Sequence, residues 1–264
     1  MFIDTHCHLD AGEFDADRDA VALAALQQGV SMIVVPAVER ANFNAVCNLA
    51  DQYAHCALAL GIHPLCVDRA QPDDVPFLAA LVEKKLSGKK QPVAIGEIGL
   101  DFFVEGYSRE RQEYYFVEQL KLARQFDLPV ILHVRRSVDD VLKHLRRIKV
   151  RGGIAHAFNG SRQQADMLID LGFKLGFGGA MTYPRALKIR ELAATLPLES
   201  MVLETDAPDI APEWLGHHGR NSPDQLPEIA QVLADLRGIK CAEVAAITTR
   251  NALDSLPKLS QLCT

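Results

Sequence analysis

The feature of this sequence that most restricts its fold is an alternation of short apolar segments with longer amphipathic segments, repeated about eight times along the chain. Continuous apolar strands that alternate with helices are typical of a parallel sheet covered by helices. A chain of 264 residues with about eight such units fits a closed (β/α)8 barrel better than an open doubly wound sheet. The predicted fold class is therefore α/β, a (β/α)8 TIM barrel.

The periodicity also predicts where the elements lie. A first strand should begin at Phe2, and further strands are expected over residues 32–35, 57–62, 93–97, 129–133, 153–156, 173–177 and 201–206. Helices are expected over residues 14–28, 42–53, 73–86, 109–126, 138–147, 162–171, 185–194 and 225–236, with an additional one over 242–256. No GxGxxG motif follows the first strand, and no linker or low-complexity segment interrupts the pattern. We therefore expect residues 1–264 to form a single TIM-barrel domain with an extra C-terminal helix.

Composition and charge argue against several classes of protein. Hydrophobic residues make up 48% of the chain, but no stretch approaches the roughly 18 uninterrupted apolar residues of a membrane helix. The first residues do not resemble a secretory signal, so we expect a cytoplasmic protein. The six cysteines have irregular spacing without a CxxC motif, which predicts neither a disulfide framework nor a cysteine zinc site. The net charge of −6 argues against broad coating of nucleic acid, although a small pocket could still bind a strand end.

Two histidines stand at the end of the first expected strand. His6 and His8 are two positions apart, so on a strand they project to the same side. Neutral imidazole is a common ligand for zinc and similar metals. Taken alone, the pair could equally be two histidines with separate hydrogen-bond partners.

Other histidines and carboxylates also stand at the ends of expected strands, as His6 and His8 do at the end of the first. In a (β/α)8 barrel all carboxyl ends of the strands open onto one face, where active sites lie. Chance placement explains poorly why so many of these residues stand at strand ends. Their nitrogen and oxygen atoms are ligands that suit zinc, manganese, iron, nickel, cobalt or, less well, magnesium. One catalytic zinc takes three or four protein ligands, so two metals that share a carboxylate use the whole set better. The predicted ligands are His6, His8, Glu97, His133, His156 and Asp206.

Five motifs in a fixed order carry a resemblance to a known family. They are DTHCHL at residues 4–9, GEIGLD at 96–101, LHVR at 132–135, HAFNG at 156–160 and LETDAP at 203–208. In this order and spacing they resemble the TatD-related metal-dependent hydrolases and deoxyribonucleases, which belong to the amidohydrolase-like superfamily of barrels. The resemblance extends over essentially the whole chain, and residues 178–186 are most similar to the YjjV branch.

The resemblance implies a two-metal centre and an activity. One divalent ion would be held by His6, His8, Glu97 and Asp206, and a second by Glu97, His133 and His156. Glu97 would bridge the two ions, whose identity could be zinc, manganese or magnesium, and Asp206 would also orient or deprotonate the attacking water. The implied function is hydrolysis of DNA or a small phosphodiester, with no membrane and no obligate protein partner. Hydrolysis of an amide, lactone or small phosphoester is the alternative, and a binding protein without activity is a third.

Other side chains near the expected opening are candidates for substrate binding. His63 and Arg135 could bind a phosphate, because a guanidinium forms paired hydrogen bonds with its oxygens. For His63, hydrogen bonding within its own loop is an equal alternative. Arg136 is expected to point away from the opening.

Three further polar residues have open assignments. Asp101 could orient a metal ligand or fix the loop that follows it. Glu204 should face the helices if the eighth strand continues through it, and a salt bridge is then expected. Asn221 could contact substrate or form a turn before the next proline.

Overall fold

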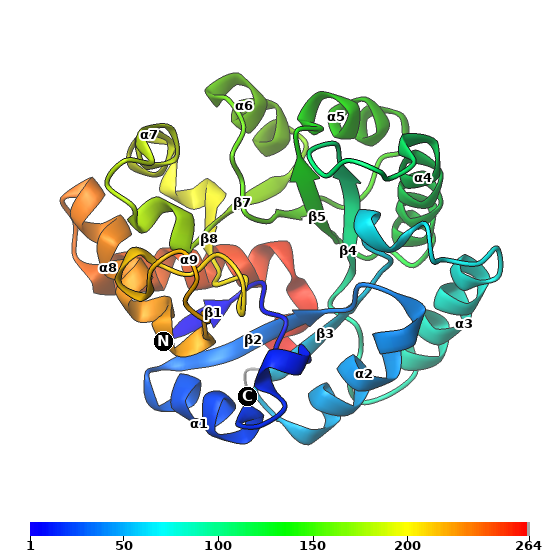
Figure 1. The fold of residues 1–264 in the computed structure, drawn as a ribbon, viewed down its shortest axis with the longest axis horizontal. Helices are drawn as coiled ribbons and strands as arrows, with labels where there is room; N and C mark the ends of the chain where they lie inside the picture. The colour runs from blue at the N-terminus through cyan, green and yellow to red at the C-terminus, as the bar shows by residue number, and fades with distance from the viewer. Residues whose placement is uncertain (263–264) are drawn as a thin grey trace.

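The centre of the molecule is a sheet of eight parallel strands, hydrogen-bonded in the order β1 to β8, in a computed structural model that describes residues 1–262. Figure 1 shows the strands arranged around a common axis with helices outside them. The predicted (β/α)8 barrel is confirmed. Cys263, one of the six cysteines considered above, lies outside the described residues. The strands are β1 Phe2–Asp4, β2 Val30–Pro36, β3 Cys56–Leu60, β4 Ala94–Asp101, β5 Val130–Arg135, β6 Gly153–Ala155, β7 Phe173–Phe177 and β8 Met201–Leu203.

The helices alternate with the strands along the chain, and their apolar sides cover the outer face of the sheet. The expected additional helix at the C-terminus is present as α9. The helices are α1 Arg18–Gln27, α2 Phe43–Gln52, α3 Asp74–Leu86, α4 Arg109–Gln125, α5 Val138–Arg147, α6 Arg162–Asp170, α7 Leu187–Thr195, α8 Leu226–Arg237 and α9 Cys241–Ser255.

Two element boundaries differ from the prediction in an informative way. The helix expected over residues 14–28 begins only at Arg18, because Gly12–Phe14 forms a 3-10 turn that buries the Phe14 ring completely. The strand expected over residues 201–206 ends at Leu203, and Asp206 has a φ of +56°. Strand alternation therefore does not determine which way the side chains after Leu203 point.

The barrel is closed between its first and last strands by residues at or just beyond the strand ends. We call this contact the β1–β8 seam, formed by Asp4, His6, Thr205 and Asp206. The Asp206 amide donates to the His6 carbonyl at 2.8 Å. The buried carboxylate of Asp4 accepts hydrogen bonds from the Thr205 amide at 3.0 Å and from its hydroxyl at 2.6 Å. The seam therefore holds the segments that follow β1 and β8 side by side.

Helix α9 closes the end of the barrel at which the strands begin. Ala252 and Leu256 pack with Leu259 against the interior side chains Ile3 and Met32. In Figure 1, α9 lies behind the ring of strands. The opposite end, where the strands finish, is left open for a pocket.

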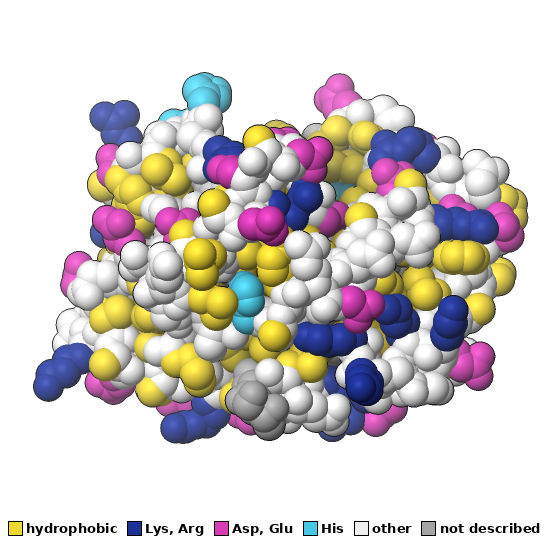
Figure 2. All heavy atoms as spheres, turned by 90° about the horizontal axis from the view of Figure 1, so that it is seen from below, with side chains coloured by type: hydrophobic (Ala, Val, Ile, Leu, Met, Phe, Trp, Pro, Cys, Tyr) yellow, Lys and Arg dark blue, Asp and Glu magenta, His cyan; other side chains and the backbone are white. Residues whose placement is uncertain are grey.

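The surface carries both signs of charge. On the face shown in Figure 2, Lys and Arg side chains are interspersed with Asp and Glu and do not form one basic patch. None of the helices in residues 1–262 is long and apolar enough to span a membrane.

Candidate metal centre

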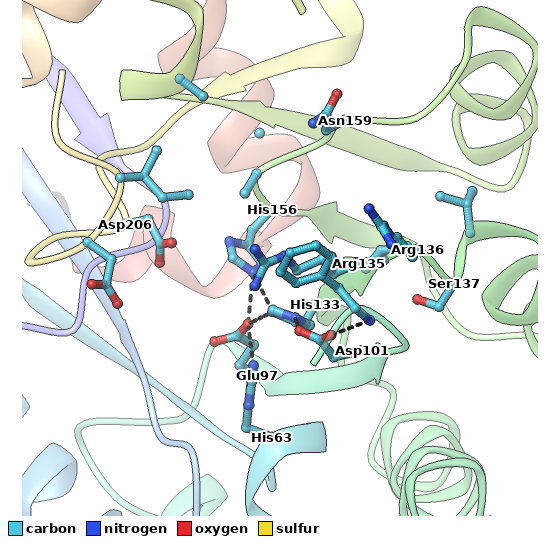
Figure 3. A pocket seen from close by; sticks show the side chains of 18 of the residues that line it. His63, Glu97, Asp101, His133, Arg135, Arg136, Ser137, His156, Asn159 and Asp206 are labelled. Carbon is cyan, nitrogen blue, oxygen red and sulfur yellow. Dashed lines mark hydrogen bonds and ion pairs between the residues drawn. The ribbon is translucent and has the colours of Figure 1, made fainter. Parts of the chain in front are cut away.

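A pocket of about 1070 Å³ opens where the strands end, on the side of the barrel opposite α9. His6 is fully buried beside it. The other side chains predicted to form the site come from several different strand ends and meet in this pocket, as Figure 3 shows for those it labels. Those that line it are His8, His63, Glu97, His133, Arg135, His156 and Asp206.

One group of side chains surrounds Oε2 of Glu97. This oxygen lies 3.2 Å from Nε2 of His6 and 3.4 Å from Nε2 of His8. The two ring nitrogens are 3.3 Å apart, because both rings follow β1 and turn to the same side. Oδ1 of Asp206, brought in by the β1–β8 seam, lies 3.4 Å from the His6 nitrogen and 3.8 Å from the His8 nitrogen. Oε2 of Glu97 and Oδ1 of Asp206 therefore both lie within 3.8 Å of the same two ring nitrogens.

The spacing of these four groups fits a tetrahedral metal site. Nitrogen and oxygen ligands lie about 2.0–2.2 Å from zinc, so neighbouring corners of a regular tetrahedron are about 3.3–3.6 Å apart. The five distances given above range from 3.2 to 3.8 Å. Direct hydrogen bonds would bring such pairs to about 2.9 Å. The donor set thus fits a divalent cation better than a network of hydrogen bonds.

A second group of imidazoles surrounds Oε1 of Glu97 (Figure 3). This oxygen lies 2.9 Å from Nδ1 of His133, 2.8 Å from Nε2 of His156 and 3.3 Å from Nε2 of His63. The His133 and His156 nitrogens are 3.2 Å apart. Each oxygen of one carboxylate therefore contacts its own set of ring nitrogens, as a bridging ligand would, and the contacts of Oε1 with His133 and His156 have the length of direct hydrogen bonds. A metal-binding role for these residues stays a prediction.

Asp101 supports one of these histidines. Strand β4 continues to Asp101, beyond the expected end at residue 97. Oδ2 of Asp101 lies 2.9 Å from Nε2 of His133, while its Oδ1 accepts hydrogen bonds from the amides of Phe103 and Val104. A carboxylate on the far nitrogen fixes the orientation of a histidine ring. Asp101 therefore fixes the loop and orients the His133 ring, and the role of that ring as a metal ligand stays a prediction.

Burial and mutual proximity shift the pKa values in this cluster. Burial opposes charge, but the Glu97 carboxylate raises the pKa of His8 to about 9 and that of His156 to about 10. Burial lowers the pKa of His6 well below its usual range and raises that of Asp206. Burial also works against ionised Glu97, yet the surrounding histidines hold its pKa well below the usual value. An ionised carboxylate beside the protonated rings of His8 and His156 is a site at which a cation can replace protons.

His63 differs from the other histidines in its hydrogen bonding. Its Nδ1 accepts a hydrogen bond from the Leu65 amide at 3.1 Å, so in the neutral ring the proton resides on Nε2. Burial lowers the pKa of His63, which favours that neutral ring. His63 thus presents an N–H donor to the pocket, which suits an anion better than a metal. The loop hydrogen bond is present, and contact with a phosphate stays a prediction.

Two guanidinium groups stand at the rim of the pocket. Arg135 and Arg136 both line it, so the expectation that Arg136 points away was wrong. Arg136 has a φ of +54°, which breaks the strand alternation on which that expectation depended. The guanidinium carbons lie 3.8 Å and 4.6 Å from the centre of the Phe103 ring. Neither guanidinium has a hydrogen bond or ion pair within residues 1–262, so both are free to bind an anion.

Two other residues differ in how their predictions turned out. Glu204 was expected to face the helices, but it is buried and lines the pocket, because the strand ends at Leu203. Burial raises the pKa of Glu204 to about 8. Asn221 is fully buried, and its amide donates to the carbonyls of Thr205 and Asp209 at 2.8 and 3.0 Å. Of the two roles considered for Asn221, the structural one is present.

Comparisons with known proteins agree with this picture. The model of the TatD-related DNase family matches residues 3–256. The uncharacterized metal-dependent hydrolase YjjV of Escherichia coli (strain K12) is 44% identical over 252 residues, which cover 95% of either chain. The uncharacterized metal-dependent hydrolase YabD of Bacillus subtilis (strain 168) is 32% identical, over 96% of this chain and 97% of the relative. The crystal structure of E. coli YjjV matches with a TM-score of 0.91 at 43% identity, covering 97% of this chain and 98% of that one.

Proposed function

Because this chain belongs to the TatD-related DNase family, we propose that it is a divalent-metal-dependent phosphodiesterase that cleaves DNA. The family and its relatives establish the coarser activity, that of a metal-dependent hydrolase. The observation that carries the finer proposal is the position of Glu97, whose two carboxylate oxygens contact separate groups of imidazoles. A carboxylate shared between two cations suits the two-metal hydrolysis of phosphate esters.

The proposed centre divides the ligands between the two oxygens of Glu97. His6, His8, Glu97 and Asp206 would hold one cation, and Glu97, His133 and His156 would hold the other. When bound, the cations would activate a water molecule and stabilise the attacking and leaving oxygens during displacement at phosphorus. Zinc and manganese suit these ligands, and magnesium suits them less well.

Asp206 has a further role in this proposal. Its side chain is 13% exposed at the pocket, whereas that of Glu97 is 2% exposed. Asp206 is therefore the carboxylate that can reach both the ligand cluster and a water molecule in the pocket. It would orient the attacking water and accept its proton.

The phosphate of the substrate would be bound by His63 and Arg135. His63 and Arg135 both line the pocket that holds the ligand cluster, and Nε2 of His63 lies 3.3 Å from Oε1 of Glu97. Hydrogen bonds from a charged donor to phosphate are stronger than neutral ones and fix its orientation. The two donors would hold phosphorus beside Asp206 while leaving the face of attack open to water.

The charge around the pocket favours the end of a DNA strand over a long duplex. Arg135 and Arg136 are accompanied in the pocket lining by the carboxylates of Asp139, Asp140 and Asp209. Together with the net charge of −6, these carboxylates would repel a continuous row of phosphates. A single terminal phosphodiester could still bind between the arginines and the ligand cluster.

The test is hydrolysis of short single-stranded oligonucleotides by purified protein. The protein is stripped with a chelator and then supplied with zinc, manganese or magnesium, and products are resolved for oligonucleotides labelled at either end. We expect cleavage only when a divalent metal is present, and Asp206→Asn should abolish it. The same preparations are offered small phosphodiesters, lactones and N-acyl compounds. Absence of DNA cleavage together with turnover of one of those compounds would replace the proposed substrate and keep the hydrolase.

A further inference from the structure

His133 and His156, the two histidines proposed to hold the second cation, differ in the support of their far ring nitrogens. His133 has the Asp101 carboxylate 2.9 Å from its Nε2. Nδ1 of His156 is buried and has no hydrogen-bond partner within residues 1–262. An unpartnered buried donor destabilises the fold and calls for an explanation.

The carboxylate nearest to that nitrogen belongs to Glu204. Oε1 of Glu204 lies 3.9 Å from Nδ1 of His156 and accepts a hydrogen bond from the amide of the next residue, Ala157. Its Oε2 is buried and has no partner among the described residues. Two unsatisfied groups, one able to donate and one able to accept, are therefore neighbours in the wall of the pocket.

The surrounding backbone leaves room for this carboxylate. Gly176, on the facing strand β7, lies so close that a Cβ atom there would overlap the Glu204 carboxyl group. The amide of Ala157 holds Oε1 on the side of the His156 ring. Glu204 is thus confined beside His156 from two directions, as Asp101 is held beside His133 by loop amides.

We propose that Glu204 is a positioning residue for His156, accepting a hydrogen bond from Nδ1–H so that the Nε2 lone pair is directed at the proposed second cation. The inference rests on the proposed metal centre. A shift of about 1 Å in the carboxylate or the ring brings the pair to hydrogen-bond distance. A cation on Nε2 strengthens the acidity of Nδ1–H, so the bond and metal binding support each other.

Metal titration tests this role without any substrate. Stripped wild-type protein and its variants are titrated with Mn²⁺ alone by calorimetry, and His156→Ala identifies the binding event that depends on this ring. We expect Glu204→Leu to weaken that event by about 10- to 100-fold and to leave the other event within about threefold. Glu204→Gln should lie between Leu and wild type, because its amide oxygen can still accept the hydrogen bond.

Two more variants separate positioning from a general loss of structure. Gly176→Ala keeps the glutamate but displaces its carboxyl group, so it should weaken the same event. Asp74→Asn changes another buried carboxylate, which lies at the start of α3 and pairs with Arg40, away from the proposed metal ligands. Both binding events should keep wild-type strength in Asp74→Asn.

The outcomes distinguish this inference from the proposed function. If the wild type binds no divalent ion, both fail. If it binds two ions and Glu204→Leu binds them equally well, or loses both events to the same extent, the positioning role alone is overturned. The positioning role is also overturned if Glu204→Gln binds metal no more tightly than Glu204→Leu. Should Glu204→Leu not fold, Gly176→Ala decides, since unaltered metal binding in that variant overturns the role.

Discussion

Replacing Glu97 by Gln is the sharpest test of a two-metal centre, because the change keeps the size of the side chain and removes its charge. The ring nitrogens around the two oxygens lie between 2.8 and 3.4 Å away and come from five histidines. In Glu97→Gln, one carboxylate oxygen becomes an NH2 group that cannot ligate a cation. At least one of the two groups of imidazoles therefore loses its anionic partner.

Two opposing effects determine how much metal affinity Glu97→Gln loses. A unit charge 4 Å from a divalent ion, at an effective dielectric constant of about 20, contributes about 8 kcal/mol, or about 16 kcal/mol for two ions. Against this, Glu97 raises the pKa of His8 to about 9 and of His156 to about 10, so at pH 7 metal binding in the wild type must remove two held protons. At about 1.4 kcal/mol for each unit by which a pKa exceeds pH 7, removing both protons costs about 7 kcal/mol, and Glu97→Gln largely removes this cost. The loss is larger than the relief, so we expect metal affinity to fall at least 10³-fold.

The measurement combines metal titration of the stripped protein with kcat/KM on a single-stranded oligonucleotide at high Mn²⁺. Glu118→Gln, which changes a half-buried carboxylate paired with Lys121 on α4, serves as the charge-matched control and should behave as wild type. Thermal unfolding of both variants without metal shows whether the fold is kept. Two metal-binding events of wild-type affinity in Glu97→Gln, with turnover within tenfold of normal, would refute the shared-carboxylate centre.

Three further outcomes are expected. Arg135→Ala should lower kcat/KM for an oligonucleotide by about 10- to 100-fold, because that factor corresponds to the loss of one charged hydrogen bond, and metal affinity should not change. An unaltered KM would show that Arg135 does not bind the phosphate. Burial opposes protonation of His8 and His156, but Glu97 raises their pKa values to about 9 and about 10. Their protons therefore stabilise the metal-free fold fully below about pH 6.5, the usual histidine pKa, and this stabilisation is lost as the pH rises through about 9 to 10. Metal binding at pH 7 should therefore release protons and tighten as the pH rises, and calorimetry in buffers of different ionisation enthalpy that shows no release would contradict it. Gly99→Ala should destabilise the protein by about 3 kcal/mol or more, because φ is +151° and a Cβ would overlap a β5 carbonyl. Gly12→Ala, whose Cβ would meet only Oδ2 of Asp15 at an ordinary contact distance of 3.8 Å, should stay within about 0.5 kcal/mol in the same denaturant titration.

The barrel could be predicted from the sequence because its determinants are local. Each buried strand is a continuous apolar segment and each helix an amphipathic one, so the period of the pattern identifies them. The helix expected from residue 14 shows the limit. Phe14 fits the helical spacing, but its ring is buried by a 3-10 turn, a contact that depends on the rest of the fold.

Candidate ligands could also be predicted, because in this fold the carboxyl ends of the strands meet on one face. The two misplaced residues, Arg136 and Glu204, share one cause. Alternation along a strand assigns a side chain to one face only while the strand continues. The chain turns at Arg136, which has a positive φ, and β8 ends at Leu203, before Glu204. No sequence pattern indicated either turn, so the side chains that complete the pocket escaped prediction.

The β1–β8 seam has a consequence for the order in which the protein is made. Asp4 and His6 are synthesised first, and their partners Thr205 and Asp206 follow about 200 residues later. A nascent chain, or a truncated one that stops before these partners, has the first histidines but no neighbour to orient them. Metal loading at the proposed site of His6, His8, Glu97 and Asp206 should therefore be among the last events of maturation, after the barrel has closed.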